Sequence, residues 1–185
     1  MADETLDHPP FPPLTWDHYF WVGDATLPSW AGFQARRGSY GAVSAAIPSD
    51  GSARLSVSPM DGAARTRPTA EQVAAFRHLL DNEAAVADAV ARALVEYCPG
   101  HAYDGDDEAL LEVSEPGELR PLVGLSGVHV LSVAHDGAAY IGFEFGCVWD
   151  DEHGAGVMTH RGRVVATGQA DVSFLEWVAR QDTGE

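Results

Sequence analysis

Turn signals in the last third of the chain constrain its fold more than any other feature of the sequence. Asp136-Gly137 and Arg161-Gly162 are short turns of the kind that join adjacent antiparallel strands, and the acidic connection Asp150–Gly154 lies between them. The segments between these turns are rich in valine and aromatic residues, which is typical of strands. Residues 127–168 are therefore predicted to form four consecutive antiparallel strands.

Because these connections can be counted, the sequence also predicts which side chains face each other. A two-residue turn places His129 opposite Glu144, and a five-residue connection then places Glu144 opposite His160. Arg163 follows in the same row, across the third turn. The same register gives an apolar face, on which the side chains of one strand meet those of its neighbours: Ile141, Phe143, Phe145, Cys147 and Trp149 with Val128, Val130, Val157, Thr159 and Val164.

The row of His129, Glu144 and His160 is a candidate chemical site. Two imidazoles and a carboxylate on neighbouring strands can hold one divalent metal ion, and no other cofactor is expected. The same groups can transfer protons, or they can be ordinary polar neighbours on a sheet surface. The sequence leaves these three interpretations open.

The acidic connection between the second and third of these strands is a second candidate site. Asp150, Asp151 and Glu152 are consecutive carboxylates next to His153, in a strand connection where binding residues are often found. They can grip arginines and lysines of a protein partner, coordinate a cation, or form a solvated turn. Trp30 is a candidate aromatic anchor for the same partner.

The charge of the chain narrows the classes of partner. Eleven arginines, with no lysine, stand against 28 acidic residues, and the formal net charge is −17. Such a surface repels nucleic acid phosphates and anionic membranes, so neither is expected as a partner. It suits a basic protein, although acidity also keeps a protein in solution. The sequence contains no nucleophile elbow, phosphate-binding glycine loop or dinucleotide fingerprint, so it does not indicate an enzyme.

Thr69 opens the clearest helix. Thr69 and Gln72 match a capping box, and apolar residues then recur every three or four positions up to Tyr97. The polar run Asp81–Glu83 interrupts this stripe, so residues 69–98 are predicted to form one long helix or two short ones. A second capping-box pair, Ser173 with Glu176, predicts a short C-terminal helix.

These segments together predict an α+β fold. It consists of an antiparallel sheet of about six strands, with the helical residues 69–98 packed on one face and the short helix at the C-terminus. The first two strands are placed at Ser39–Ala46 and Ser52–Ser58. The proline-rich residues 1–13 are predicted to form a flexible arm, residues 14–181 a single domain, and residues 182–185 a frayed tail. Aromatic residues 16–33 are expected to pack on the core, with an exposed binding stripe as the alternative.

The chain shows no sign of export or membrane insertion. Its N-terminus has no basic start followed by an apolar run, and no window approaches the about 20 apolar residues of a membrane span. The two cysteines, Cys98 and Cys147, are interpreted as buried reduced thiols. A bacterial-type cytoplasm is the expected location.

The sequence resembles an uncharacterised bacterial family, one of the domains of unknown function. The resemblance rests on the C-terminal pattern GFEFGCxWDxEHGxGVxxH with the preceding GVHVLSV and HDG, and on the helical stretch PTAEQVAAFRHLLDNEAAVADAVARALVEYCP. It covers residues 68–171 and assigns no functional residue. In size and acidity alone, members resemble small immunity proteins that neutralise bacterial toxins.

The sequence therefore favours an acidic, protein-binding module, with an immunity protein that neutralises a basic toxin as one form of it. The alternative is a metal-binding protein or metal-dependent enzyme that uses His129, Glu144 and His160. A domain with no ligand of its own is the third interpretation. The sequence does not indicate an oligomeric state.

Overall fold

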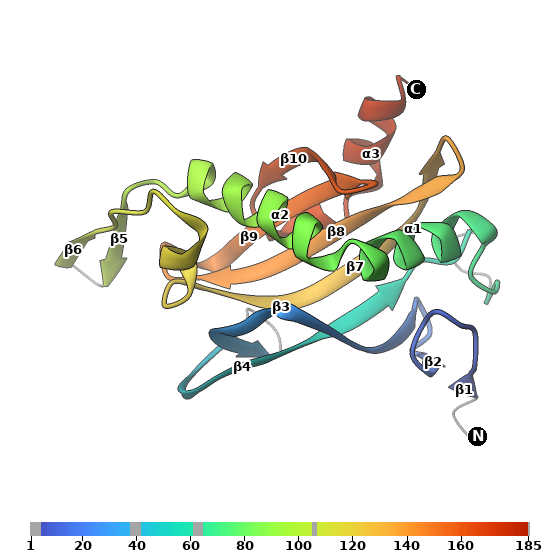
Figure 1. The fold of residues 1–185 in the computed structure, drawn as a ribbon, viewed down its shortest axis with the longest axis horizontal. Helices are drawn as coiled ribbons and strands as arrows, with labels where there is room; N and C mark the ends of the chain where they lie inside the picture. Colours follow the sequence, from blue (N-terminus) through green and yellow to red (C-terminus); the bar gives the residue numbers. More distant parts are fainter. Residues whose placement is uncertain (1–4, 38–41, 61–64, 105–106, 185) are drawn as a thin grey trace.

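The dominant element of the fold is a mixed sheet of eight strands, in the order β1-β2-β3-β4-β7-β8-β9-β10 (Figure 1). The computed structural model describes residues 5–37, 42–60, 65–104 and 107–184, with the backbone alone for residues 37, 42–47, 103–104 and 107–109. The strands of the large sheet are β1 (Thr5–Leu6), β2 (Leu14–Trp16), β3 (Trp21–Arg37), β4 (Ala42–Val57), β7 (Val123–His135), β8 (Ala138–Cys147), β9 (Asp150–His160) and β10 (Arg163–Gly168). A separate two-stranded sheet consists of β5 (His101–Asp104) and β6 (Asp107–Leu110).

Helical elements cover both faces of the large sheet. The helices α1 (Ala70–Asp81) and α2 (Glu83–Tyr97) lie across one face, and η2 (Pro116–Leu119) follows β6 (Figure 1). The short 3-10 helix η3 (Ala170–Ser173) and α3 (Glu176–Thr183) pack on the other face. No helix in the described part of the chain is long and apolar enough to cross a membrane.

The predicted antiparallel sheet of about six strands is wrong, because the sheet is larger and two of its strands run parallel. β4 pairs with β7 in parallel, from Arg54↔Gly127 to Val57↔Val130. Between these two strands the chain passes through both helices, β5, β6 and η2, and a crossover of this kind returns it to the sheet in the same direction. Turn counting does not reveal this pairing, because no hairpin joins the two strands.

The two short strands predicted near residues 39–58 are one long strand, β4, paired with β3. The predicted start at residues 39–41 lies outside the described residues. The β3–β4 register shifts three times between Thr26 and Ala35, which breaks the alternation of buried and exposed side chains. β3 also contains Pro28 and Gly32, so the sequence does not identify this segment as a strand.

The helix signals gave one correct boundary and one wrong one. Thr69 caps α1 with the predicted capping box, in which its side chain accepts from Gln72 N and its N–H donates to Gln72 Oε1. Asn82 separates two helices, which decides between the two alternatives. At the C-terminus α3 begins only at Glu176, without a side-chain cap, and Ser173 donates to the carbonyl of Ala170 instead.

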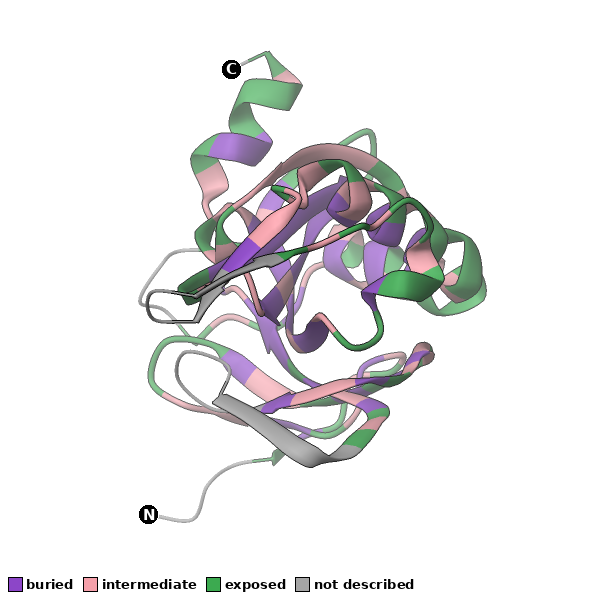
Figure 2. Cartoon of the chain, turned by 90° about the vertical axis from the view of Figure 1, so that its left-hand side faces the viewer, coloured by how far each residue is buried: buried purple, intermediate pink, exposed green. Residues whose placement is uncertain are grey.

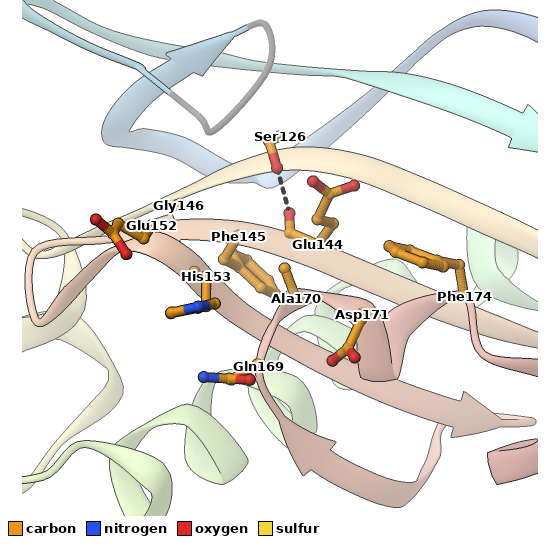
Figure 3. A pocket seen from close by; sticks show the side chains of 11 residues that line it. Ser126, Glu144, Phe145, Gly146, Glu152, His153, Gln169, Ala170, Asp171 and Phe174 are labelled. Atoms are coloured by element: carbon orange, nitrogen blue, oxygen red, sulfur yellow. Dashed lines mark hydrogen bonds between the residues drawn. The ribbon is translucent and has the colours of Figure 1, made fainter.

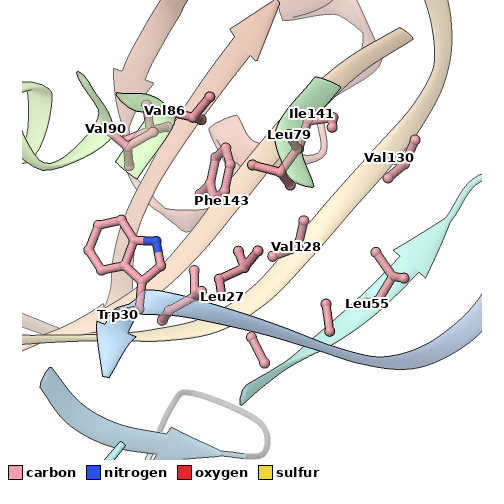
Figure 4. Packing of buried hydrophobic residues seen from close by; sticks show 14 of the residues in the cluster. Leu27, Trp30, Leu55, Leu79, Val86, Val90, Val128, Val130, Ile141 and Phe143 are labelled. Carbon is pink, nitrogen blue, oxygen red and sulfur yellow. The ribbon is translucent and has the colours of Figure 1, made fainter. Parts of the chain in front are cut away.

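The predicted apolar face of the strand block is confirmed. Val128 and Val130 pair with Phe143 and Ile141, and all four side chains are buried. They meet Leu79 and other apolar side chains of α1 and α2 in the main core (Figure 4). Figure 2 shows the buried residues gathered between these helices and the sheet. This burial is the main source of stability for the fold.

The N-terminal residues pack more closely than their composition suggests. Leu6 and Phe11 are buried, and the Phe11 ring stacks on Phe76 of α1 at 4.8 Å between centroids. Trp21 and Phe33 are buried as well. The described residues 5–13 therefore cover the edge of the core, and at the other end α3 extends to residue 183, while residues 1–4 and 185 lie outside the described part.

Glycines let η3 lie directly on the sheet face opposite α1 and α2. A Cβ added at Gly142 would overlap the carbonyl oxygen of Ser173, and at Gly156 it would lie 2.6 Å from the carbonyl oxygen of Gln169. Only the absence of a side chain permits this approach of two backbones. η3 is therefore fixed against β8 and β9 by backbone contact.

Gly142→Val is expected to lower the free energy of unfolding by about 1–3 kcal/mol, because the new side chain forces η3 off the sheet. Urea unfolding followed by circular dichroism measures this change. Gly117→Ala serves as the control, since an added Cβ there meets nothing within 4 Å. Equal stability of Gly142→Val and the wild type would contradict the close contact.

The two thiols differ in accessibility. Cys147 is buried and Cys98 is partly exposed, and both are free cysteines. Burial raises the pKa of the Cys147 thiol to about 12, so it stays protonated at neutral pH. The expectation of a buried thiol therefore holds for Cys147 and only in part for Cys98.

In the native protein at pH 8, Ellman's reagent is expected to modify Cys98 rapidly and Cys147 only after unfolding. The reason is that only an accessible thiolate attacks the reagent. Absorbance counts the thiols released with and without denaturant, and Cys98→Ser is expected to abolish the fast reaction. Rapid reaction of both thiols in the native state would show that Cys147 is not sealed in the core.

Candidate functional site

The predicted row of facing residues is wrong in its register. His129 lies opposite Gly142 rather than Glu144, and Glu144 lies opposite Gly156 rather than His160. The predicted constellation is therefore not assembled as one row across the sheet.

Two local features displace the register. β7 bulges between Val130 and Ala134, and β8 joins β9 through a tight turn at Val148-Trp149. Residues 150–154, predicted as the connection, belong to β9 itself. A register shift between Phe145 and Cys147 accompanies the tight turn, and the net displacement of each pairing is an even number of residues. His129 and Glu144 therefore still point to the predicted side of the sheet.

A hydrogen-bonded chain of three polar side chains crosses β4, β7 and β8. Ser56 Oγ lies 2.7 Å from His129 Nδ1, and His129 Nε2 lies 2.8 Å from Glu144 Oε2. Gly127 leaves the room for this contact, because a Cβ there would lie 3.0 Å from Glu144 Oε2 and 3.1 Å from His129 Nε2. These two hydrogen-bond contacts thus hold the Glu144 carboxylate in one position.

The chemistry of this chain fixes the tautomer of the neutral His129 ring. The Glu144 carboxylate only accepts, so Nε2 carries the proton and donates it to Oε2. Nδ1 then has the lone pair that accepts from the Ser56 hydroxyl. The opposite tautomer would place two acceptors face to face.

His160 lies apart from this chain. Its ring is buried next to Tyr140, and its Nε2 lies 3.0 Å from the carbonyl oxygen of His135 and 3.2 Å from that of Ala138. Within the described ranges, no three His, Cys, Asp or Glu side chains lie close enough together to hold a metal ion. The predicted metal site therefore gains no support from the geometry.

A cleft of about 350 Å³ opens next to Glu144, between the sheet and η3. Figure 3 shows Glu144 on the β7 side of the cleft and Gln169, Ala170 and Asp171 on the η3 side, with Phe174 at one end. Glu152 and His153 lie at the other end. The volume is at the small end of the range for ligand-binding pockets.

The walls of the cleft are negatively charged. The carboxylates of Glu144, Glu152 and Asp171 come from β8, β9 and η3, and none of the described lining residues is an arginine. The Arg36 side chain lies over Gly146 on the cleft face of the sheet, where its Cδ would lie 2.5 Å from an added Cβ, and its guanidinium pairs with Asp151 at 3.4 Å. The arrangement favours a cationic ligand.

The polar chain presents a carboxylate to the cleft rather than a nucleophile. A serine, a histidine and a glutamate in this order resemble the groups of a hydrolase triad. Ser56, however, is only 7% exposed and is not among the lining residues, whereas the Glu144 side chain is 34% exposed and lines the cleft. A substrate carbonyl in the cleft would therefore meet the wrong end of the chain.

A comparison with family models supplies the family of the chain. Residues 40–175, well over half of the 185 residues, match the domain of unknown function DUF6985. The chain belongs to this family. No curated protein and no solved structure matches it. The whole cleft of this DUF6985 domain, from Ser126 to Phe174, falls inside the matched region.

The acidic residues predicted to bind a partner form the rim of the cleft in this DUF6985 domain. Asp150 accepts from the backbone N–H of His153 and lies 2.9 Å from its ring Nδ1. Partial burial alone would raise the pKa of Asp150, but the hydrogen bonds from His153 outweigh it and lower that pKa. Asp151 and Glu152 are exposed beside it. Asp150 therefore stays ionised at neutral pH.

Trp30 does not lie on this rim or on the surface. It is 1% exposed, and its ring lies 4.9 Å from those of Phe33 and Phe145 in the core. A partner cannot reach it in this conformation. Phe174 and Trp177, in contrast, are 46% and 54% exposed after η3.

Three residues of the site carry no signal in the sequence that marks them as site residues. Ser56 joins His129 only through the parallel pairing of β4 with β7, which no local pattern signals. Asp171 and Phe174 lie next to the predicted C-terminal helix, and no motif marks them as site residues. A hint for both was present, because the glycines around Glu144 leave room for a covering segment.

The neutral His129 ring is expected to carry its proton on Nε2, because Glu144 accepts there. Long-range ¹H–¹⁵N NMR correlations distinguish the two ring nitrogens directly. Ser56→Ala is the control and is expected to leave the tautomer unchanged. A proton found on Nδ1 would contradict the hydrogen-bonded chain.

Proposed function

We propose that this DUF6985 domain is a protein-binding module that docks a basic partner over the acidic cleft and its rim, Asp150–Glu152. The observation that carries the proposal is the convergence of carboxylates from β8, β9 and η3 around one cavity. The net charge of −17 extends the same field over the whole chain. A partner with a positive patch is attracted from a distance and oriented by the cleft.

Exposed aromatic side chains supply the apolar part of such an interface. Phe174 lines the cleft, and Trp177 follows it at the start of α3. Large aromatic residues of this kind often contribute most of the binding free energy at the centre of an interface. We assign the anchor role to these two residues in place of the buried Trp30.

We place this activity in the cytoplasm, and we propose that the partner is neither a nucleic acid nor a membrane, because both carry negative charge. A basic toxin is a partner of the required chemistry. An immunity protein acts by covering the cationic site of such a toxin, and the small size and acidity of this chain suit that role. Carboxylates that meet that site also speed association.

We do not propose a metal-dependent enzyme. Of the three residues suggested as ligands, His129 and Glu144 bind each other, while His160 binds backbone carbonyls. A two-residue site would leave most of the coordination to water.

Neutralising the rim with Asp150→Asn, Asp151→Asn and Glu152→Gln together is expected to slow association with the partner about tenfold or more at low salt. The matched control removes three exposed helical carboxylates, with Asp81→Asn, Asp88→Asn and Glu96→Gln. The partner is captured from the producing cell in stoichiometric amount, identified, and then measured by biolayer interferometry against all three proteins.

The control variant is expected to behave as the wild type apart from a smaller change due to net charge. Capture of no stoichiometric basic protein at low salt would refute the proposal. So would a partner that binds the rim variant and the control variant at the same rate.

A further inference from the structure

One oxygen of the Glu144 carboxylate accepts a hydrogen bond within the described part of the chain, and the other can accept one from a ligand. Oε2 accepts from His129, and Oε1 accepts no hydrogen bond from the described part of the chain. Because Ser56 holds His129 in turn, the available oxygen keeps a fixed position at the side of the cleft. A carboxylate positioned in advance loses little conformational entropy when a ligand binds.

An aromatic ring stands at the end of the same cleft. Phe174 is 46% exposed, and its ring meets the His129 ring edge-on at 5.4 Å between centroids. This contact orients the ring beside Glu144 (Figure 3). A cation that binds Glu144 is thereby offered an aromatic surface as well.

The remaining acceptors are spread around the cleft rather than clustered at one point. Asp171 lies on the η3 side, and Glu152 lies at the end away from Phe174 (Figure 3). A guanidinium has five N–H donors in a plane, stacks on aromatic rings, and is more weakly hydrated than an ammonium. It therefore matches divergent acceptors and an aromatic wall better than the compact ammonium of a lysine does.

From these observations we infer that the cleft is a receptor for one guanidinium group, carried by an arginine side chain of the partner. The guanidinium donates to Glu144 Oε1 and packs against Phe174. The inference rests on the proposed protein-binding function and names the chemistry that the cleft recognises.

The test uses small probes and the full chain. ¹H–¹⁵N NMR spectra are recorded during titration with n-butylguanidinium and, in parallel, with n-butylammonium. Peptides acetyl-Gly-Arg-Gly-amide and acetyl-Gly-Lys-Gly-amide form the second pair of probes. The guanidinium probes are expected to shift the amides of the cleft, from Ser126 to Phe174, and to bind about tenfold or more tightly than their ammonium counterparts.

Matched variants assign the binding to particular groups. Glu144→Gln is expected to weaken the guanidinium probes about tenfold or more, the usual loss for a charge-assisted hydrogen bond. Glu96→Gln removes one carboxylate from α2, on the other face of the sheet, and is expected to leave affinity within about twofold. Phe174→Leu keeps the apolar bulk and is expected to weaken binding about threefold or more. Melting temperatures show that each variant is folded.

The outcomes separate this inference from the proposed function. Equal binding of guanidinium and ammonium, shifts outside the cleft, or unchanged affinity in Glu144→Gln would each overturn the guanidinium receptor. If the association rate of the partner still falls in the rim variant while the probes do not bind, the proposed protein-binding function is retained and the guanidinium receptor is rejected. If n-butylguanidinium binds and the arginine peptide does not, the guanidinium group recognised by the cleft would belong to a small molecule. That result would overturn the assignment to an arginine side chain of the partner.

Discussion

The contact of η3 with the bare backbone of β8 and β9 is the constraint on which the rest of this face depends. It brings a segment from the end of the chain within direct reach of Glu144 in the middle of the sheet. Side chains change rotamer, but two backbone segments in direct contact can hardly move relative to each other. The distance across the cleft is therefore set by the main chain. A site built on rigid elements in this way holds its groups within a narrow range of positions.

The same face is organised by what fills the space above its glycines. η3 fills it at Gly142 and Gly156, and the Arg36 side chain fills it at Gly146. Glu144 lies between Gly142 and Gly146 on β8 and opposite Gly156 on β9. The cleft is the part of the face that neither covering segment occupies. The polar chain through His129 then decides which way the exposed carboxylate points.

Local patterns predicted the helical residues 69–98 and the last four strands of the large sheet, and little of the strands before Thr69. The turns at Asp136-Gly137 and Arg161-Gly162 and the cap at Thr69 were correct, because each is determined by a few neighbouring residues. β3 and the parallel pairing of β4 with β7 were missed, because their partners are distant in sequence and their registers are irregular.

The candidate site shows the same division. The face on which Glu144 lies and its proximity to His129 followed from alternation along the strands, which survives any even shift of register. The prediction that His160 lies opposite Glu144 depended on the length of the connection between β8 and β9. That connection is a tight turn rather than a five-residue loop, so Glu144 lies opposite Gly156 instead. Trp30 was expected both to pack on the core with residues 16–33 and to anchor a partner, and its burial supports the first expectation. The strand that buries it, β3, was not identified.

The distribution of arginine gives the acidic cleft its significance. Arg54 and Arg163 pair with aspartates away from the cleft, and Arg36, which lies over Gly146, pairs with Asp151 of the rim. In the described part of the chain, neither Glu152 nor Asp171 forms an ion pair, and Glu144 pairs only with a histidine. Carboxylates around one cavity give it a negative potential, which attracts a cation. The absence of an arginine partner for these three described carboxylates is the feature that supports the proposed docking of a positive group.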